Sequence, residues 1–435
     1  MTPSARLAAA IELLDAIEAA PQAPADAVAN GWFRARRFIG GGDRRWISDL
    51  AWNVLRQRLR LDWHLARSPN TGRTRAIAWL LLGEHATADA VAGLFSGARY
   101  GPAPLDEAER RLLKQLADGT LADPRMDEAT RLNLPGFVLE PFRTRFGEAL
   151  EAEAAAMDAP ASLDLRANLL KGDRAAARAA LAAEGHAAEP TPFSPWGLRL
   201  GGRAPVTGTN AFRDGLVEIQ DEGSQLIAWL ADAQPGLQVL DFCAGAGGKT
   251  LAMAATMRNS GRLIAADVSA QRLEAAVRRL RRAGVHNVER RAIAPGEKWL
   301  KRAAKKFDRV LVDAPCTGTG TWRRNPDARF RLSRETLSEL LTKQREILAS
   351  AARLVKTGGR LVYATCSLLP EENEHQVDAF LAAHGDFTLM PLADAWAALA
   401  SATTPPCAGP YLSLSPAKHG TDGFFAAILA RGPAG

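Results

Sequence analysis

Cysteine is scarce in this sequence, and none of it is spaced as a metal site or a disulfide framework requires. Only four cysteines occur in 435 residues, far fewer than in disulfide-dependent secreted domains. No C-x-x-C or C-x-x-H pair begins a zinc site. We therefore expect no metal, and the thiols remain as buried or reactive side chains. They are Cys243, Cys316, Cys366 and Cys407.

Long apolar runs and a secretory leader are also missing. A membrane-spanning helix needs about 20 consecutive apolar residues. The longest apolar stretches, such as Ala76–Leu82, have the length of core segments. The first residues do not combine a basic patch, an apolar block and a small-residue cleavage site. We expect a cytoplasmic monomer with no membrane partner.

Acidic residues are depleted in one segment of the chain. Between Arg258 and Arg334 there are 20 lysines and arginines but only 7 aspartates and glutamates, while the net charge of the whole chain is +7. A basic field of this kind favours a polyanionic partner such as RNA. An ordinary solvated helix face remains an alternative for about half of these charges.

Three parts of the chain differ in their apolar periodicity. Residues 1–130 have helical spacing, as between Leu7 and Ile11, and almost no strand-like alternation. Residues 131–215 mix short alternating strands with two helices, which predicts a small α+β module. Residues 216–435 alternate apolar strands with helices. This pattern predicts an α/β domain with a doubly wound, mostly parallel sheet.

Within the last part, several strands can be placed individually. Asp308–Val312 and Arg360–Ala364 are apolar segments that precede or follow helical stretches. Tyr411–Leu414 and Gly423–Leu429 form a candidate pair of terminal strands, with an antiparallel arrangement as one option. These strands predict which polar residues lie at strand ends.

A glycine-rich loop, Asp241–Thr250, joins the first predicted strand of the α/β domain to a helix. Such a loop lets backbone N–H groups approach a nucleotide-like ligand. A phosphate-binding P-loop would need glycine at the position of Cys243, and a dinucleotide loop would need it at Thr250. A methyltransferase loop fits better. Asp267 ends the next strand, where a carboxylate can accept hydrogen bonds from ribose hydroxyls.

Two cysteines follow predicted parallel strands. Asp313 and Cys316 come after the strand that contains Val310, and Cys366 comes after the strand that begins near Leu361. Ligands bind at the carboxyl ends of such strands, so both thiols should face one crevice. Either cysteine alone would be read as a buried apolar residue.

A pair of thiols has a use in cytosine chemistry. A thiolate that adds to C6 of cytosine makes C5 nucleophilic enough to attack a sulfonium methyl group. A second group must then accept the C5 proton so that the enzyme is released. Asp313 is suited to hydrogen-bond the N3 edge of the ring, with a purely structural role as the alternative. The base must be single-stranded or flipped out of a helix.

Together, four motifs resemble the Sun/Nop-type RNA 5-methylcytosine methyltransferases, in particular the RsmB-like branch that acts on 16S ribosomal RNA. The motifs are Asp241–Thr250, Asp313–Cys316, Arg323–Asp327 and Thr365–Asn373. The first 130 residues look NusB-like. The resemblance implies a class I, Rossmann-like methyltransferase domain, S-adenosyl-L-methionine as cofactor, and RNA as partner.

The same resemblance implies roles for individual residues. Cys366 would be the nucleophile, Cys316 would help to release the product, and Lys249 would lie near the target base. The residues that would contact S-adenosylmethionine are Cys243, Ala244, Gly245, Ala246, Gly247, Gly248, Lys249, Asp267 and Asp313. Two alternatives stay open: a tRNA cytosine-C5 methyltransferase, and a non-catalytic RNA-binding factor in ribosome assembly.

One departure from the family pattern concerns the adenosine. Members usually carry an acidic residue after the third strand, where this chain reads Val-Glu-Arg-Arg-Ala-Ile-Ala-Pro over residues 288–295. Glu289 is expected to lie too early in the strand to replace it. The contact to the adenosine is therefore the least defined part of the expected site.

Overall fold

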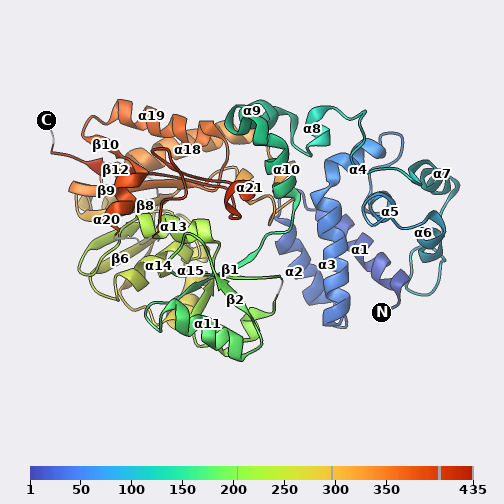
Figure 1. The fold of residues 1–435 in the computed structure, drawn as a ribbon, viewed down its shortest axis with the longest axis horizontal. Helices are drawn as coiled ribbons and strands as arrows, with labels where there is room; N and C mark the ends of the chain where they lie inside the picture. The colour runs from blue at the N-terminus through green and yellow to red at the C-terminus, as the bar shows by residue number, and fades with distance from the viewer. Residues whose placement is uncertain (203, 295–296, 400–402, 434–435) are drawn as a thin grey trace. The chain divides into compact units, whose positions relative to one another are not determined.

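The computed structural model describes residues 1–202, 204–294, 297–399 and 403–433 (Figure 1). The chain divides into two compact units. One comprises Met1–Pro160 with Trp322–Leu332, and the other comprises Ala161–Thr321 with Ser333–Gly435. The short segment Trp322–Leu332 therefore belongs to the first unit, although the residues before and after it in the chain belong to the second. The division into three domains stays a prediction.

The first unit is helical, as its periodicity predicts. Several of its helices begin at polar caps: the Thr2 side chain accepts from the N–H of Ala5, and Thr71 forms a capping box with Thr74. The main helices are α1 (Pro3–Glu18), α2 (Ala25–Ala35), α3 (Gly41–Arg56), α4 (Arg58–His64), α5 (Gly72–Leu82), α6 (Ala88–Leu94), α7 (Glu107–Leu116), α8 (Glu128–Arg131), α9 (Leu139–Phe146), α10 (Leu150–Asp158) and α17 (Ala328–Arg331).

Polar contacts attach the segment Trp322–Leu332 to this helical unit. Arg329 is buried and donates to the carbonyl of Asn133 and to the carboxylate of Asp158, each at 2.8 Å. Asp327 accepts from the N–H of Ala25, the first residue of α2, at 3.0 Å. A buried arginine requires such partners because its charge is costly to desolvate.

The second unit begins with a small antiparallel sheet in the order β2-β3-β1-β4. The strands are β1 (Leu163–Ala167), β2 (Ala188–Pro190), β3 (Gly197–Leu200) and β4 (Val217–Ile219), with α11 (Arg174–Ala183), α12 (Asn210–Arg213) and α13 (Glu222–Leu230). Alternating Leu163 and Leu165 against polar neighbours predicted β1. The mixture of strands and helices agrees with the expected α+β character.

The larger sheet has the order β10-β12-β9-β8-β5-β6-β7, and β11 pairs with β12. Strands β5 to β9 run parallel to one another, whereas β12 is antiparallel to β9, β10 and β11. The strands are β5 (Gln238–Asp241), β6 (Arg262–Asp267), β7 (Val288–Ala292), β8 (Phe307–Asp313), β9 (Val355–Thr365), β10 (Phe387–Met390), β11 (Leu412–Leu414) and β12 (Phe424–Arg431). This confirms the predicted α/β fold with a mostly parallel sheet.

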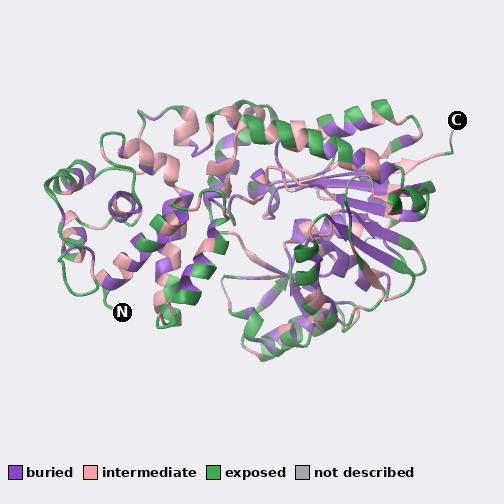
Figure 2. Cartoon of the chain, turned by 180° about the vertical axis from the view of Figure 1, so that it is seen from behind, coloured by how far each residue is buried: buried purple, intermediate pink, exposed green. Residues whose placement is uncertain are grey.

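Helices cover both faces of the larger sheet, and strands β5, β6, β8 and β12 are mostly buried, whereas no residue of the edge strand β7 is (Figure 2). The helices are α14 (Gly248–Thr256), α15 (Ala270–Ala283), α16 (Lys298–Arg302), α18 (Arg334–Ala352), α19 (Glu374–Ala383), α20 (Leu392–Ala398) and α21 (Pro416–His419). Burial on both faces explains why these strands read as continuous apolar runs.

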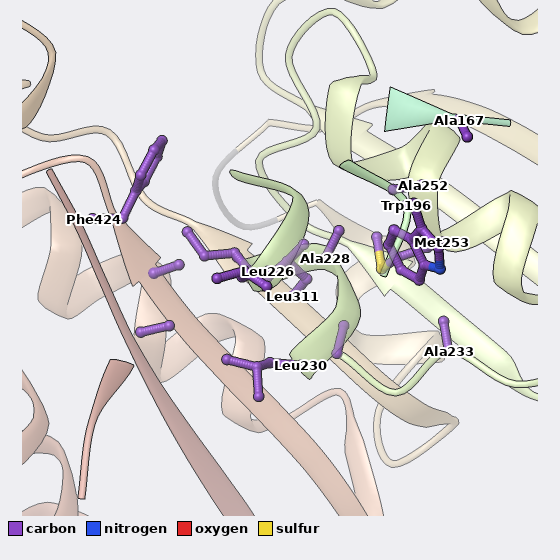
Figure 3. Packing of buried hydrophobic residues seen from close by; sticks show 14 of the residues in the cluster. Ala167, Trp196, Leu226, Ala228, Leu230, Ala233, Ala252, Met253, Leu311 and Phe424 are labelled. Carbon is purple, nitrogen blue, oxygen red and sulfur yellow. The ribbon is translucent and has the colours of Figure 1, made fainter. Parts of the chain in front are cut away.

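One hydrophobic core runs from the small sheet into the larger one. Ala167 of β1 and Leu311 of β8 belong to the same cluster, with Leu226 of α13 and Met253 of α14 also in it (Figure 3). Burying a leucine or methionine contributes roughly 1.5–3 kcal/mol. The two sheets of this unit are therefore held together by packing.

Candidate active site

The carboxyl ends of four adjacent parallel strands meet at one edge of the larger sheet. β5 ends at Asp241, β6 at Asp267 and β8 at Asp313, while Cys366 directly follows β9. Since β6, β5, β8 and β9 are neighbours in this order, the polar ends lie side by side. This is the edge at which doubly wound sheets bind ligands.

The glycine-rich loop turns sharply between β5 and α14. Gly245 and Gly247 have φ angles of +54° and +80°, in the left-handed region that glycine tolerates. The carboxylate of Asp267 accepts from the N–H groups of Gly245 and Ser269, each at 2.8 Å. Asp267 is thus buried against the loop, at the place expected for a ribose contact.

The remaining loop residues are held through their backbone. The N–H of Ala244 donates to Ala266 at 3.0 Å, and the N–H of Gly247 donates to Ala244 at 2.9 Å. Arg279 donates to the carbonyl of Ala246 at 2.7 Å. Burial, with the nearby carboxylates adding to it, strongly raises the pKa of the Cys243 thiol. Cys243 is therefore a neutral thiol in this loop.

Asp241 is a buried carboxylate that the sequence reasoning placed in the loop but gave no role. Its Oδ2 accepts from Thr250 at 2.6 Å, while its Oδ1 is buried and has no partner among the described residues. Burial raises its pKa to about 7, although the hydrogen bond from Thr250 opposes this. An ammonium group, such as that of the amino-acid end of S-adenosylmethionine, fits this oxygen.

Lys249 and Asp313 form an ion pair across the edge. Lys249 Nζ lies 2.6 Å from Asp313 Oδ2, and the lysine side chain is only 10% exposed. Burial acts to lower the pKa of Lys249, but the charge and hydrogen bond of Asp313 outweigh it and raise the pKa overall. The negative charge of a Cys366 thiolate acts in the same direction. The lysine is therefore a buried cation beside the cysteines.

The two predicted thiols are in contact. The Sγ atoms of Cys316 and Cys366 are 3.4 Å apart, and both residues are partly buried. The hydrogen bond to Cys366 raises the pKa of Cys316 well above that of a free thiol, and burial and the charge of Glu372 add to this. Cys316 is thus a protonated thiol.

Not every residue singled out in the sequence lies at this edge. Cys407 exchanges hydrogen bonds with the backbone of Ser413 in β11, which gives it a structural role. Glu289 pairs with Arg262 and Arg291 and lies three positions before the end of β7, so it is too early, as expected. Pro295 lies outside the described residues.

Several residues that hold the site were missed at the sequence level. Glu372 and Asn373 appear in a motif of the sequence, but nothing in their spacing indicates that they bond to both cysteine loops. Glu297, a further acidic residue after β7, caps the N–H of Ala294 at 3.3 Å. The one sequence feature that could have indicated a role for Glu372 is its position shortly after Cys366 in the chain.

Among the residues that the structure describes, no group of three or more His, Cys, Asp or Glu side chains could hold a metal ion. In the same described ranges, no helix combines the length and the apolar character that crossing a membrane requires.

Known proteins resemble the chain over most of its length. A family described as 16S rRNA methyltransferase RsmB/F matches residues 228–430, and an RsmF/B-like, ferredoxin-like domain matches residues 134–207. The ribosomal RNA small subunit methyltransferase B of Escherichia coli O9:H4 (strain HS) is 31% identical over 90% of this chain and 92% of its own. A probable enzyme of the same name from Synechocystis sp. is 36% identical over 69% and 67%.

Solved structures agree with this. The protein PH0851 superposes with a TM-score of 0.79 at 26% identity and covers 99% of both chains. The expected family and fold class are therefore confirmed by sequence as well as by structure. The chain belongs to the RsmB/F family of ribosomal RNA methyltransferases, and S-adenosylmethionine is its methyl donor.

Proposed function

We propose that this protein methylates carbon 5 of a cytosine in 16S ribosomal RNA through a covalent bond between Cys366 and C6 of the base. The contact of two thiols, 3.4 Å apart at the ends of adjacent parallel strands, carries the proposal. Relatives named ribosomal RNA small subunit methyltransferase B support a small-subunit substrate. The first 130 residues, the module over 131–215 and the domain over 216–435 would act together on that RNA.

The first step is addition of the Cys366 thiolate to C6. The buried Lys249 ammonium stabilises the thiolate electrostatically, because opposite charges attract strongly where water is excluded. Addition pushes negative charge onto the N3 edge of the ring. Lys249, which is paired with Asp313, carries a proton that it can donate in a hydrogen bond to the N3 edge as the negative charge develops.

The second step transfers the methyl group. S-adenosylmethionine supplies the sulfonium methyl that C5 of the base attacks. On the protein side, the proposed contacts are the loop from Cys243 to Gly248, Lys249, Asp267 and Asp313, to which we add Asp241. Asp267 orients the loop through Gly245, and the partnerless Asp241 Oδ1 is available to an ammonium group.

Product release requires loss of the C5 proton and cleavage of the bond to Cys366. Cys316 is the group in contact with Cys366, and we assign it the removal of that proton. In the resting site a Cys366 thiolate raises the pKa of Cys316. Once Cys366 is a neutral thioether that contribution is gone, so Cys316 ionises more readily and loses its proton to solvent water. The Cys316 thiolate then accepts the C5 proton, and the C6–S bond breaks with its electron pair returning to Cys366 as a thiolate.

Methyl transfer to a defined RNA tests the function. The protein is incubated with methyl-labelled S-adenosylmethionine and unmodified 16S ribosomal RNA, and the product is digested to nucleosides. We expect the label in 5-methylcytidine. Label in another nucleoside would overturn the cytosine-C5 assignment, and label in transfer RNA but not in ribosomal RNA would replace the substrate. No transfer to either RNA would leave a non-catalytic RNA-binding role.

A further inference from the structure

The two cysteine loops are held by two residues that are adjacent in the chain. Glu372 ends the short 3-10 helix Pro370–Glu372, and Asn373 follows it directly. Both side chains are completely buried, at 0% exposure. Buried polar groups of this kind are retained only where each finds partners.

Glu372 holds the loop of Cys316. Its carboxylate accepts from the N–H of Thr317 at 2.9 Å and also from the hydroxyl of Thr317. Gln344 of α18 donates to the same carboxylate at 2.9 Å and to the carbonyl of Pro315 at 3.0 Å. The peptide groups on both sides of Cys316 are therefore fixed by Glu372, directly or through Gln344.

Asn373 does the same for Cys366. The hydroxyl of Thr365 donates to Asn373 Oδ1 at 2.5 Å, and Asn373 Nδ2 donates to the carbonyl of Ser367 at 2.9 Å. These are the two residues that flank Cys366. One side-chain amide thus bridges the chain on either side of the nucleophile.

We propose that Glu372 and Asn373 are positioning residues that set the Cys316–Cys366 separation, Glu372 through Cys316 and Asn373 through Cys366. Because they are neighbours, one stretch of backbone fixes the distance between the two loops. The hydroxyl of Tyr363 in β9 donates to the carbonyl of Glu372 at 2.6 Å and ties that backbone to the sheet. The inference rests on the proposed covalent mechanism.

The two residues therefore act on different steps. Glu372 holds the group assigned to product release, and its negative charge also favours the neutral form of Cys316. Asn373 holds the group that forms the adduct. A merely structural role would weaken both steps together, whereas separate positioning roles would divide them.

Two isosteric variants test this division in the full-length protein. Glu372→Gln replaces one of the two carboxylate oxygens by an NH2 group, so that only one oxygen is left to accept from Thr317 and Gln344, and Asn373→Asp loses the donor to Ser367. The measurements are single-turnover methyl transfer and the fraction of RNA that stays bound to protein in denaturant. For Glu372→Gln we expect near-normal transfer but about tenfold more trapped adduct. For Asn373→Asp we expect about tenfold slower adduct formation and no accumulation.

Gln376→Leu is the matched control. Gln376 is also buried, and its amide donates to Leu341 rather than to either cysteine loop. It should leave the ratio of trapped adduct to transferred methyl unchanged. If Glu372→Gln does not fold, Thr317→Val removes one bond to Glu372 and should shift the ratio in the same direction by a smaller factor.

Two controls distinguish a failure of this inference from a failure of the proposed function on which it rests. Wild-type protein must form 5-methylcytidine and Cys316→Ala must accumulate adduct, or the proposed function itself fails. If both behave so, but Glu372→Gln and Asn373→Asp leave the ratio of trapped adduct to transferred methyl unchanged, as expected of Gln376→Leu, the positioning roles are wrong.

Discussion

Cys316 and Cys366 touch through their sulfur atoms, so the ionisation of each thiol depends on the state of the other. Either cysteine alone reads as a small buried apolar residue. The contact raises the pKa of Cys316, and the buried Lys249 cation lies near Cys366, so the two thiols have different surroundings. The different roles proposed for these two identical side chains therefore depend on their surroundings.

Substitution of each cysteine should therefore produce different failures. Cys316→Ala should leave adduct formation intact and block release, so that RNA stays bound to the protein in denaturing electrophoresis. Cys366→Ala should form no adduct. Loss of a proton-transfer group should lower multiple-turnover rates on the order of a hundredfold or more. Identical behaviour of the two variants would refute the assignment.

Asp241 gives cofactor binding a pH dependence. Its pKa of about 7 means that most of it carries a proton at pH 5.5, whereas an ammonium group pairs with the ionised form. Binding must then release that proton, so affinity should rise with pH. For a pKa near 7, S-adenosylmethionine should bind roughly tenfold more tightly at pH 7.0 than at pH 5.5.

Calorimetric titration at the two pH values measures this difference. Asp241→Asn keeps the size of the side chain and cannot ionise, so it should bind more weakly at pH 7.0 and show little change between the two conditions. A wild-type affinity that falls or stays level as the pH rises would show that Asp241 does not pair with the cofactor.

At the level of elements, the sequence predicted what local patterns determine. Asp308–Val312 and Arg360–Ala364 fall within β8 and β9, and Tyr411–Leu414 with Gly423–Leu429 corresponds to the antiparallel pair β11 and β12. Because the ends of these strands were predicted, both cysteines could be placed at the same edge of the sheet. The bonds from Glu372 to Thr317 could not be predicted, because they join loops that are distant along the chain, and those from Asn373 depend on how the loop after Cys366 folds back.

A close backbone approach between two loops supplies a test at this scale. The N–H of Gly320 donates to the carbonyl of Cys366 at 3.0 Å, and the N–H of Gly423 donates to Gly320 at 2.8 Å. A Cβ at Gly320 would lie 2.1 Å from the carbonyl oxygen of Gly423. Gly320→Ala should therefore destabilise the protein by about 1–3 kcal/mol and lower methyl transfer.

Gly385→Ala is the comparison, because a Cβ there meets no atom within 4 Å. It should change the free energy of unfolding by no more than about 0.5 kcal/mol. Denaturant unfolding measures both variants. Equal stability of the two would mean that the loops can separate at Gly320 without cost.

At the scale of the whole molecule, two expectations based on position in the sequence differ from the structure. The motif Arg323–Asp327 lies between two stretches of the second unit, yet its segment packs with the helical unit through Asp327 and Arg329. The basic field counted along Arg258–Arg334 is also less concentrated than expected. Several of its arginines pair with carboxylates, including Arg262, Arg282, Arg290, Arg309 and Arg331.

Two lysines of that field lie at the opposite, amino-terminal ends of the parallel strands. Lys305 and Lys306 are exposed and directly precede β8, whereas Cys316 follows its carboxyl end. A strand of this length rises about 3.3 Å per residue, which separates the two edges by roughly 20 Å. Arg272, in contrast, is 63% exposed and lies beside the glycine-rich loop at the carboxyl edge.

Charge reversal at the two edges should therefore affect RNA differently. The double variant with Lys305→Glu and Lys306→Glu should change RNA affinity less than about twofold and leave its salt dependence as in wild type. Arg272→Glu should weaken binding several-fold and reduce the slope of log affinity against log salt by about one charge. Filter binding without cofactor, at several salt concentrations, measures both slopes. A large loss in the lysine variant would mean that RNA also reaches the amino edge of the sheet, far from the thiols.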